Sequence, residues 1–153
     1  MSGGAEARRV ADVTRADFKI PRALAEEMFA AARAAAPEEC CGLLGGEGDR
    51  AASVYPLRNV APRPGVAYEA APAELFGAQR LMRARGETLV AVYHSHPRSA
   101  DPEPSRADVR LAFYPEAFYL IIGFDDAGGC VLRAFRISER EGRWEAARFE
   151  LGG

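Results

Sequence analysis

The spacing of apolar side chains predicts two long helices and a set of strands. Apolar positions recur at helical spacing over residues 21–36 and 72–86, and each run begins at a proline, which is favoured in the first turn of a helix. Short runs rich in β-branched and aromatic residues predict strands, and Gly45 and Gly46 are expected to end the second one. The strands are expected over residues 18–20, 40–44, 51–57, 88–93, 117–124, 130–137 and 144–151. Because strands and helices do not alternate strictly, this pattern predicts an α/β domain with helices on a mixed, mostly antiparallel sheet.

Length and composition indicate one folded unit. The chain has 153 residues, 48% of them hydrophobic, which is enough for one well-packed core and too little for two. Residues 1–15 contain mostly Gly, Ala and charged side chains without a period, so we expect a disordered lead there and a single domain over residues 16–153.

Charge and cysteine content exclude several classes of protein. A net charge of −2 gives no basic excess of the kind that nucleic-acid binding needs. The three cysteines, Cys40, Cys41 and Cys130, do not form a disulfide framework and fit a reducing compartment. No signal-peptide core is present, and no run approaches the roughly 18–20 apolar residues that a membrane span requires. We therefore expect a soluble, cytoplasmic protein that binds neither nucleic acid nor membrane.

Both histidines of the chain lie where one predicted strand ends. Side chains two positions apart on a strand share a face, so His94 and His96 are expected to point the same way, roughly 6–7 Å apart at the backbone. Three prolines then force a turn before Ser105, which is expected to cap a short helix with Asp108 in its first turn. Two imidazoles and one carboxylate are a frequent ligand set of catalytic zinc, which lowers the pKa of water and suits amide hydrolysis.

Each part of this segment also has an ordinary structural explanation. Ser-x-x-Asp is a common capping pattern at helix N-termini, and a single His-x-His on a strand is more often incidental than ligating. The order of strand, His-x-His, proline-rich turn and Ser-x-x-Asp is much more specific than either motif alone. The combination therefore favours a metal site.

These residues resemble the signature of the JAMM or MPN+ metalloproteases, in which an upstream Glu precedes His-Ser-His-Pro, a short loop and Ser-x-x-Asp. Residues 37–46 are similar to the family segment that carries the catalytic glutamate, and Glu39 is the matching position. Eleven residues separate His96 from Asp108, one more than in the commoner family pattern. This longer loop and residues 108–112 are similar to the bacterial member that removes cysteine from a ubiquitin-like sulfur-carrier protein.

The resemblance implies a curved MPN fold and a role for each site residue. It implies that His94, His96 and Asp108 hold zinc, that Glu39 is the general base, and that Ser105 hydrogen-bonds the oxyanion. The residues alone leave Glu39 open to a second explanation, a solvated charge at a helix-to-strand junction, with Glu38 as its competitor.

The sequence leaves three functions open. The first is a zinc peptidase that binds the C-terminal tail of a ubiquitin-like sulfur carrier by strand addition and cleaves after its last glycine. The others are a non-catalytic MPN-type scaffold and a metal-dependent amidohydrolase of small molecules. A second copy of the chain is a further candidate partner. Arg98 and Arg106 flank the expected cleft, either to steer an acidic partner or as ordinary solvated surface, and the tail 151–153 either mimics a product in a neighbouring copy or is a frayed end.

Overall fold

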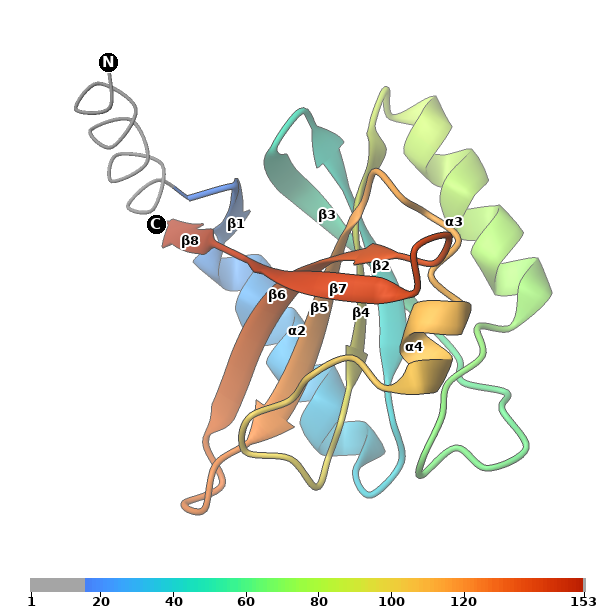
Figure 1. Cartoon of the computed structure of the whole chain (residues 1–153). Helices are drawn as coiled ribbons and strands as arrows, with labels where there is room; N and C mark the ends of the chain where they lie inside the picture. Colours follow the sequence, from blue (N-terminus) through green and yellow to red (C-terminus); the bar gives the residue numbers. More distant parts are fainter. Residues whose placement is uncertain (1–15, 153) are drawn as a thin grey trace.

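The structure is a computed structural model that describes residues 16–152; the predicted disordered lead lies outside the described residues (Figure 1). Three helices and eight strands form one domain. In chain order the elements are β1 (Phe18–Pro21), α2 (Arg22–Ala35), β2 (Cys41–Glu47), β3 (Arg50–Leu57), α3 (Pro72–Ala84), β4 (Thr88–Ser95), α4 (Arg106–Arg110), β5 (Phe118–Phe124), β6 (Cys130–Ser138), β7 (Arg143–Ala147) and β8 (Phe149–Gly152). The two long helices lie where the 3.6-residue spacing predicts them.

All eight strands belong to one sheet, in the order β7-β6-β5-β4-β2-β3-β1-β8. Four neighbouring pairs are antiparallel and three are parallel, which confirms the mixed, mostly antiparallel sheet. Strands β7 and β8 lie at opposite ends of this order, yet only Arg148 separates them along the chain. The sheet must therefore curve until its two ends approach each other.

The predicted last strand, residues 144–151, is therefore wrong in one respect, because it is two strands. Arg148 leaves the pairing with β6, and its N–H donates to Asp17 Oδ2 at 2.8 Å while its carbonyl accepts from Asp17 N at 2.8 Å. Beyond it, Leu151 and Gly152 pair with β1. The tail thus belongs to the sheet of its own chain, which does not support the product-mimic hypothesis, and Gly153 lies outside the described residues.

The two faces of the sheet bury separate apolar clusters. Helix α2 packs on one face through Leu24, Ala25, Met28 and Ala32, against strand residues that include Leu44 and Tyr93. On the other face, Ala78 and Met82 of α3 pack with residues that include Leu43 and Val92. Successive strand side chains point to opposite faces, so Tyr93 lies on the α2 side and Val92 on the α3 side. None of the described helices is long and apolar enough to cross a membrane.

The expected stop at Gly45 and Gly46 is wrong, since β2 continues through both to Glu47. A Cβ atom on Gly46 would lie 2.0 Å from the carbonyl oxygen of Arg50, and one on Gly45 would lie 2.7 Å from Glu87 Oε1. The pairing of β2 with β3 also shifts register between these two glycines. Glycine is needed here for close approach inside a hairpin, a use that a sequence pattern does not separate from a chain break.

Candidate metal centre

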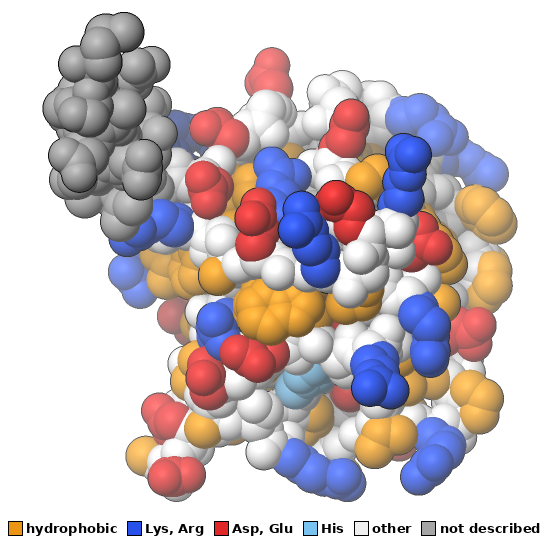
Figure 2. Space-filling model, in the orientation of Figure 1, with side chains coloured by type: hydrophobic (Ala, Val, Ile, Leu, Met, Phe, Trp, Pro, Cys, Tyr) orange, Lys and Arg blue, Asp and Glu red, His pale blue; other side chains and the backbone are white. Residues whose placement is uncertain are grey.

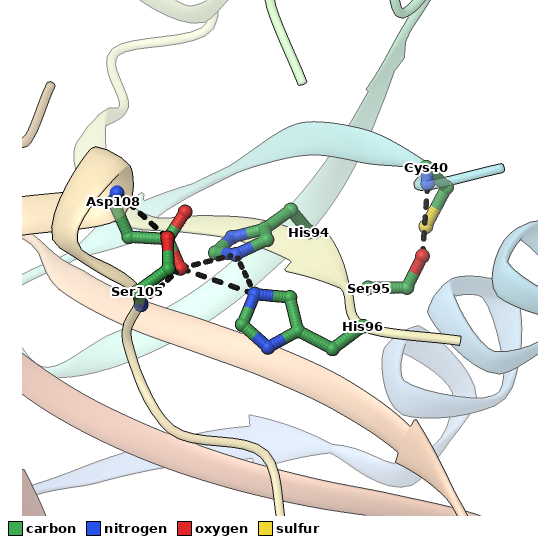
Figure 3. A network of polar contacts seen from close by, with 6 residues as sticks. All are labelled: Cys40, His94, Ser95, His96, Ser105 and Asp108. Carbon is green, nitrogen blue, oxygen red and sulfur yellow. Dashed lines mark hydrogen bonds and ion pairs between the residues drawn. The ribbon is translucent and has the colours of Figure 1, made fainter. Parts of the chain in front are cut away.

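Strand β4 brings the two imidazole rings together. His94 is completely buried near the end of β4, where it pairs with Cys41 of β2 and Ile121 of β5. His96 lies just beyond the strand, and its N–H continues the ladder by donating to the carbonyl of Ile122 at 2.8 Å. The two Nε2 atoms are 3.1 Å apart (Figure 3). The structure therefore brings the two side chains to one point, as the alternation of the strand predicts.

Asp108 reaches the same point from α4. Its Oδ2 atom lies 3.1 Å from His94 Nε2 and 3.1 Å from His96 Nε2. Ser105 Oγ accepts from the N–H of Asp108 at 3.0 Å, and the N–H of Ser105 donates to Asp108 Oδ2 at 2.9 Å. This reciprocal capping box holds the carboxylate toward the rings (Figure 3). The capping explanation and the site explanation of Ser-x-x-Asp are thus compatible, because the cap orients the acid.

Glu39 enters the site from the start of β2. Its side chain is 5% exposed, and one of its carboxylate oxygens lies within 4.8 Å of a ring nitrogen of each histidine. The hydroxyl of Ser95 accepts from the N–H of Cys40 at 2.8 Å on the α2 side of the sheet, which ties the residue after Glu39 to the histidine strand. Glu38 is exposed. Of the two competing glutamates, only Glu39 lies at the site.

Burial and neighbouring charge shift the ionisation of these groups. Burial raises the pKa of Glu39 to about 7, with His96 opposing the shift and Asp108 adding to it. Burial alone would raise the pKa of Asp108, but hydrogen bonds with both histidines hold it well below its usual range. Burial lowers the pKa of His94. Asp108 is therefore an anion and His94 is neutral, as metal ligands must be. Burial lowers the pKa of His96, but the hydrogen bond with Asp108 and the charges of Asp108 and Glu39 together outweigh it, so that the pKa of His96 lies above its usual value. Glu39 is balanced between its two protonation states.

The three atoms nearest one another fit a metal ion. The two Nε2 atoms and Asp108 Oδ2 form a triangle with sides of 3.1 Å, close to the separation of about 3.3–3.4 Å between tetrahedral zinc ligands at about 2.0–2.1 Å. Three electron-rich atoms at these distances are best satisfied by one shared cation. Glu39 is the alternative third ligand, but its distance of up to 4.8 Å leaves room for a water-sized group.

Two residues of the loop between β3 and α3 also contact the site, although the sequence pattern does not predict it. Tyr68 stacks on His94, with ring centroids 4.5 Å apart and planes at 24°. Asn59 Nδ2 donates to the carbonyl of Glu39 at 2.9 Å and to that of Ala67 at 3.0 Å. Its Oδ1 accepts from the N–H of Ala61 at 3.0 Å, a turn that asparagine favours and that is the one local signal in the sequence. Asn59 thus fastens the loop that carries Tyr68 to the residue proposed as base.

The site opens into a cleft of about 290 Å³. Glu39, His96 and Ser105 line one part of it, and Val66 and Arg98 line another. Arg98 therefore lies in the cleft, whereas Arg106 lines a neighbouring groove. The cysteines Cys40 and Cys41 are buried and are not in the candidate ligand group.

Known proteins are similar to this chain in both sequence and fold. It is 41% identical over 91 residues to the desampylase of Haloferax volcanii, an alignment that covers 58% of this chain and 65% of that protein. It is 38% identical over 116 residues to the CysO-cysteine peptidase of Mycobacterium tuberculosis, covering 74% and 78%. A crystal structure of a JAB1/MPN domain protein from Archaeoglobus fulgidus superposes with a TM-score of 0.56 at 20% identity, covering 89% of this chain and 100% of that one.

These comparisons confirm the predicted resemblance, the MPN fold and the enzyme class. The structural likeness supports the fold, and the similarity to the CysO-cysteine peptidase supports the peptidase class. The family described as prokaryotic homologs of the JAB domain matches residues 21–138. The chain therefore belongs to the prokaryotic JAB homologues and is a metallopeptidase of the JAMM type.

Proposed function

We propose that the protein is a zinc-dependent peptidase that hydrolyses the amide bond after the C-terminal glycine of a ubiquitin-like sulfur-carrier protein. The observation that carries this proposal is the convergence of two imidazoles and one carboxylate on one point, with a second, buried carboxylate beside them. We assign His94, His96 and Asp108 as the ligands. A zinc ion held there supplies Lewis acidity, which polarises a carbonyl and makes water more acidic.

Glu39 has the position and the ionisation of a general base. Amide hydrolysis needs a group that takes a proton from the attacking water and gives it to the leaving amine. A carboxyl with a pKa of about 7 can do both near neutral pH. Glu39 lines the cleft, where an attacking water would lie, and within the described residues its buried Oε1 atom has no hydrogen-bond partner that competes for a proton.

Ser105 supports the reaction as a hydrogen-bond donor. Its oxygen accepts the N–H of Asp108 in the cap, so the hydroxyl hydrogen is not used there. Ser105 lines the same cleft as Glu39 and His96. It donates to the oxygen that becomes negative when water attacks the scissile carbonyl.

The size of the cleft and the named relatives support a protein tail as substrate. A cleft of about 290 Å³ accepts an extended chain of small residues but not a folded domain. One relative is named CysO-cysteine peptidase, which indicates a conjugate of cysteine as its substrate. The full set of five residues, Glu39, His94, His96, Ser105 and Asp108, favours a peptidase over a non-catalytic scaffold.

The test is mass spectrometry of carrier adducts incubated with wild type, Glu39→Gln and Glu38→Gln. We expect Glu39→Gln to lose about 10²–10⁴-fold in cleavage rate, because general-base catalysis contributes that much. Its metal content, measured by elemental analysis, stays at the wild-type level. Glu38→Gln is the matched control and keeps full activity, since Glu38 is exposed. Undiminished cleavage by Glu39→Gln contradicts the base assignment, and faster turnover of small amides than of adducts favours an amidohydrolase of small molecules.

A further inference from the structure

A second groove adjoins the site and is lined by cationic and aromatic side chains. It has a volume of about 490 Å³ and lies between α4 and the turn that joins β6 to β7. Arg106 and Arg110 contribute from α4, and Arg143 and Trp144 contribute from β7. Figure 2 shows Lys and Arg side chains over α4, beside apolar surface along β7. Among residues 16–152, no Asp or Glu lines this groove.

The basic groove contrasts with the charge of the whole chain. The protein carries a net charge of −2, so three arginines without an acid among them are not a general property of its surface. Among the described residues, Arg106 and Arg110 form no ion pair, whereas the nearby acids Asp101 and Glu103 pair with Arg133 at 2.9 and 3.5 Å. The two guanidinium groups on α4 are therefore available to a partner.

Arg143 and Trp144 complete the groove in different ways. Arg143 pairs with Glu141 at 3.4 Å, but both side chains are exposed, so this pair is weak and exchangeable. Trp144 is half-buried, and its ring meets Phe135 edge-on, with centroids 5.1 Å apart and planes at 84°. Its indole is thus held in place as an apolar wall beside the arginines. Arginine and tryptophan are the residues most enriched where protein interfaces concentrate binding energy.

The groove is continuous with the candidate metal centre. Ser105 lines both the groove and the cleft that contains Glu39 and His96. A chain that occupies the groove therefore lies beside the candidate metal centre. A groove in this position contacts a part of the substrate close to the bond that is cut.

We propose that this groove docks an acidic segment of the protein substrate, next to the tail that enters the cleft. The identity of the occupant as substrate rests on the proposed function. Guanidinium groups bind carboxylates through two parallel hydrogen bonds, which gives orientation as well as affinity. Contact of the same segment with Trp144 adds apolar area to the ion pairs.

Trp144 makes the groove directly observable, because it is the single tryptophan of the chain. The probes are two synthetic peptides, Glu-Glu-Glu-Glu-Gly-Gly and Gln-Gln-Gln-Gln-Gly-Gly, and the readout is tryptophan fluorescence during titration. We expect the acidic peptide to change the emission saturably and the glutamine peptide to leave it nearly unchanged. Raising the salt concentration weakens the response, since salt screens exposed charges.

Matched variants localise the effect. Arg106→Gln/Arg110→Gln weakens binding of the acidic peptide about fourfold to twenty-fivefold, because both arginines are exposed and each exposed ion pair contributes a factor of about two to five. Arg80→Gln/Arg83→Gln removes the same charge from the exposed surface of α3 and leaves the affinity within about twofold of wild type. Arg143→Gln provides a second, independent variant that does not touch α4.

Three results would overturn the inference: equal responses to both peptides, equal losses in both double variants, or tighter binding of a single-stranded oligonucleotide that carries the same number of charges. Because the fluorescence readout needs no catalysis, it is separate from the proposed function. A protein that cleaves no adduct but keeps the acid-dependent signal disproves the peptidase proposal, and with it the identity of the occupant as substrate, but not the docking of an acidic segment. A peptidase without that signal disproves only the groove.

Discussion

The strand side and the loop side of the candidate metal centre are built in different ways. On the strand side, His94 is completely buried and its strand is paired on both edges. On the loop side, Asp108 belongs to a helix of five residues, where the N–H of Ser105 donates to its carboxylate and its own N–H donates to the Ser105 hydroxyl. The backbone ladder therefore positions one half of the site, and single side-chain contacts position the other. Substitutions of the ligands on the strand side should therefore abolish metal binding, whereas substitutions around Asp108 on the loop side should shift the side chains of the site and lower activity without abolishing metal binding.

The largest effect is expected from His94→Ala on the strand side. It removes one of the three atoms that converge at 3.1 Å, so the protein should lose its metal and with it nearly all activity, well beyond the roughly 10–100-fold cost of losing an outer-shell partner. Elemental analysis of the purified variant measures the metal. Tyr93→Phe is the matched control in the same strand, since among the described residues the buried Tyr93 hydroxyl has no hydrogen-bond partner. A full metal complement in His94→Ala would remove His94 from the ligand set.

The next effect is expected from Ser105→Ala on the loop side, where two roles are combined. Loss of the donated hydrogen bond should lower kcat by about 10²–10³-fold. Loss of the cap should destabilise the protein by about 1 kcal/mol, measured by denaturant unfolding. Ser105→Thr keeps both the cap and the hydroxyl and should restore most of kcat. If Ser105→Ala loses stability but no rate, Ser105 is only a cap.

The same contrast explains what the sequence predicts and what it does not. The period of two along β4 is sufficient to predict that His94 and His96 converge, and Ser-x-x-Asp is sufficient to predict the cap of α4. The approach of Glu39 to the histidines depends on the register of β2 against β4, which joins Cys40 to a serine 55 residues away. No local pattern contains that register. Only the family resemblance indicated it.

Errors in the prediction arise where one residue type serves two purposes. Gly45 and Gly46 permit close packing within β2, although glycine pairs more often end strands. Tyr68 lies in a loop without periodicity, so its contact with His94 has no signature in the chain. Arg148 interrupts an apolar run because the two ends of the curved sheet meet there, which is a property of the whole fold.

The third and smallest effect tests how a loop supports the strand side. Asn59→Asp keeps the acceptor for Ala61 but places a carboxylate oxygen against the carbonyl oxygens of Glu39 and Ala67. The resulting shift of Glu39 should lower kcat about tenfold to a hundredfold with little change in KM, since misplacing a catalytic group by about 1 Å can lower the rate about a hundredfold. Glu74→Ala is the control. Glu74, on α3, accepts from the N–H of Arg58 at 2.7 Å and so holds the same loop as Asn59, but it does not contact Glu39.

A double-mutant cycle decides whether Asn59 acts through Glu39. If it does, Asn59→Asp should lower kcat by less than about twofold when Glu39 is already Gln, because residues that work as a unit are not additive. Hydrogen exchange gives a readout that does not depend on activity: the N–H of Glu39, which donates to the carbonyl of Pro64 at 2.8 Å, should exchange faster in Asn59→Asp but not in Glu74→Ala. Additive losses of rate together with unchanged exchange at Glu39 would show that Asn59 stabilises the loop alone, and that the strand side is positioned without it.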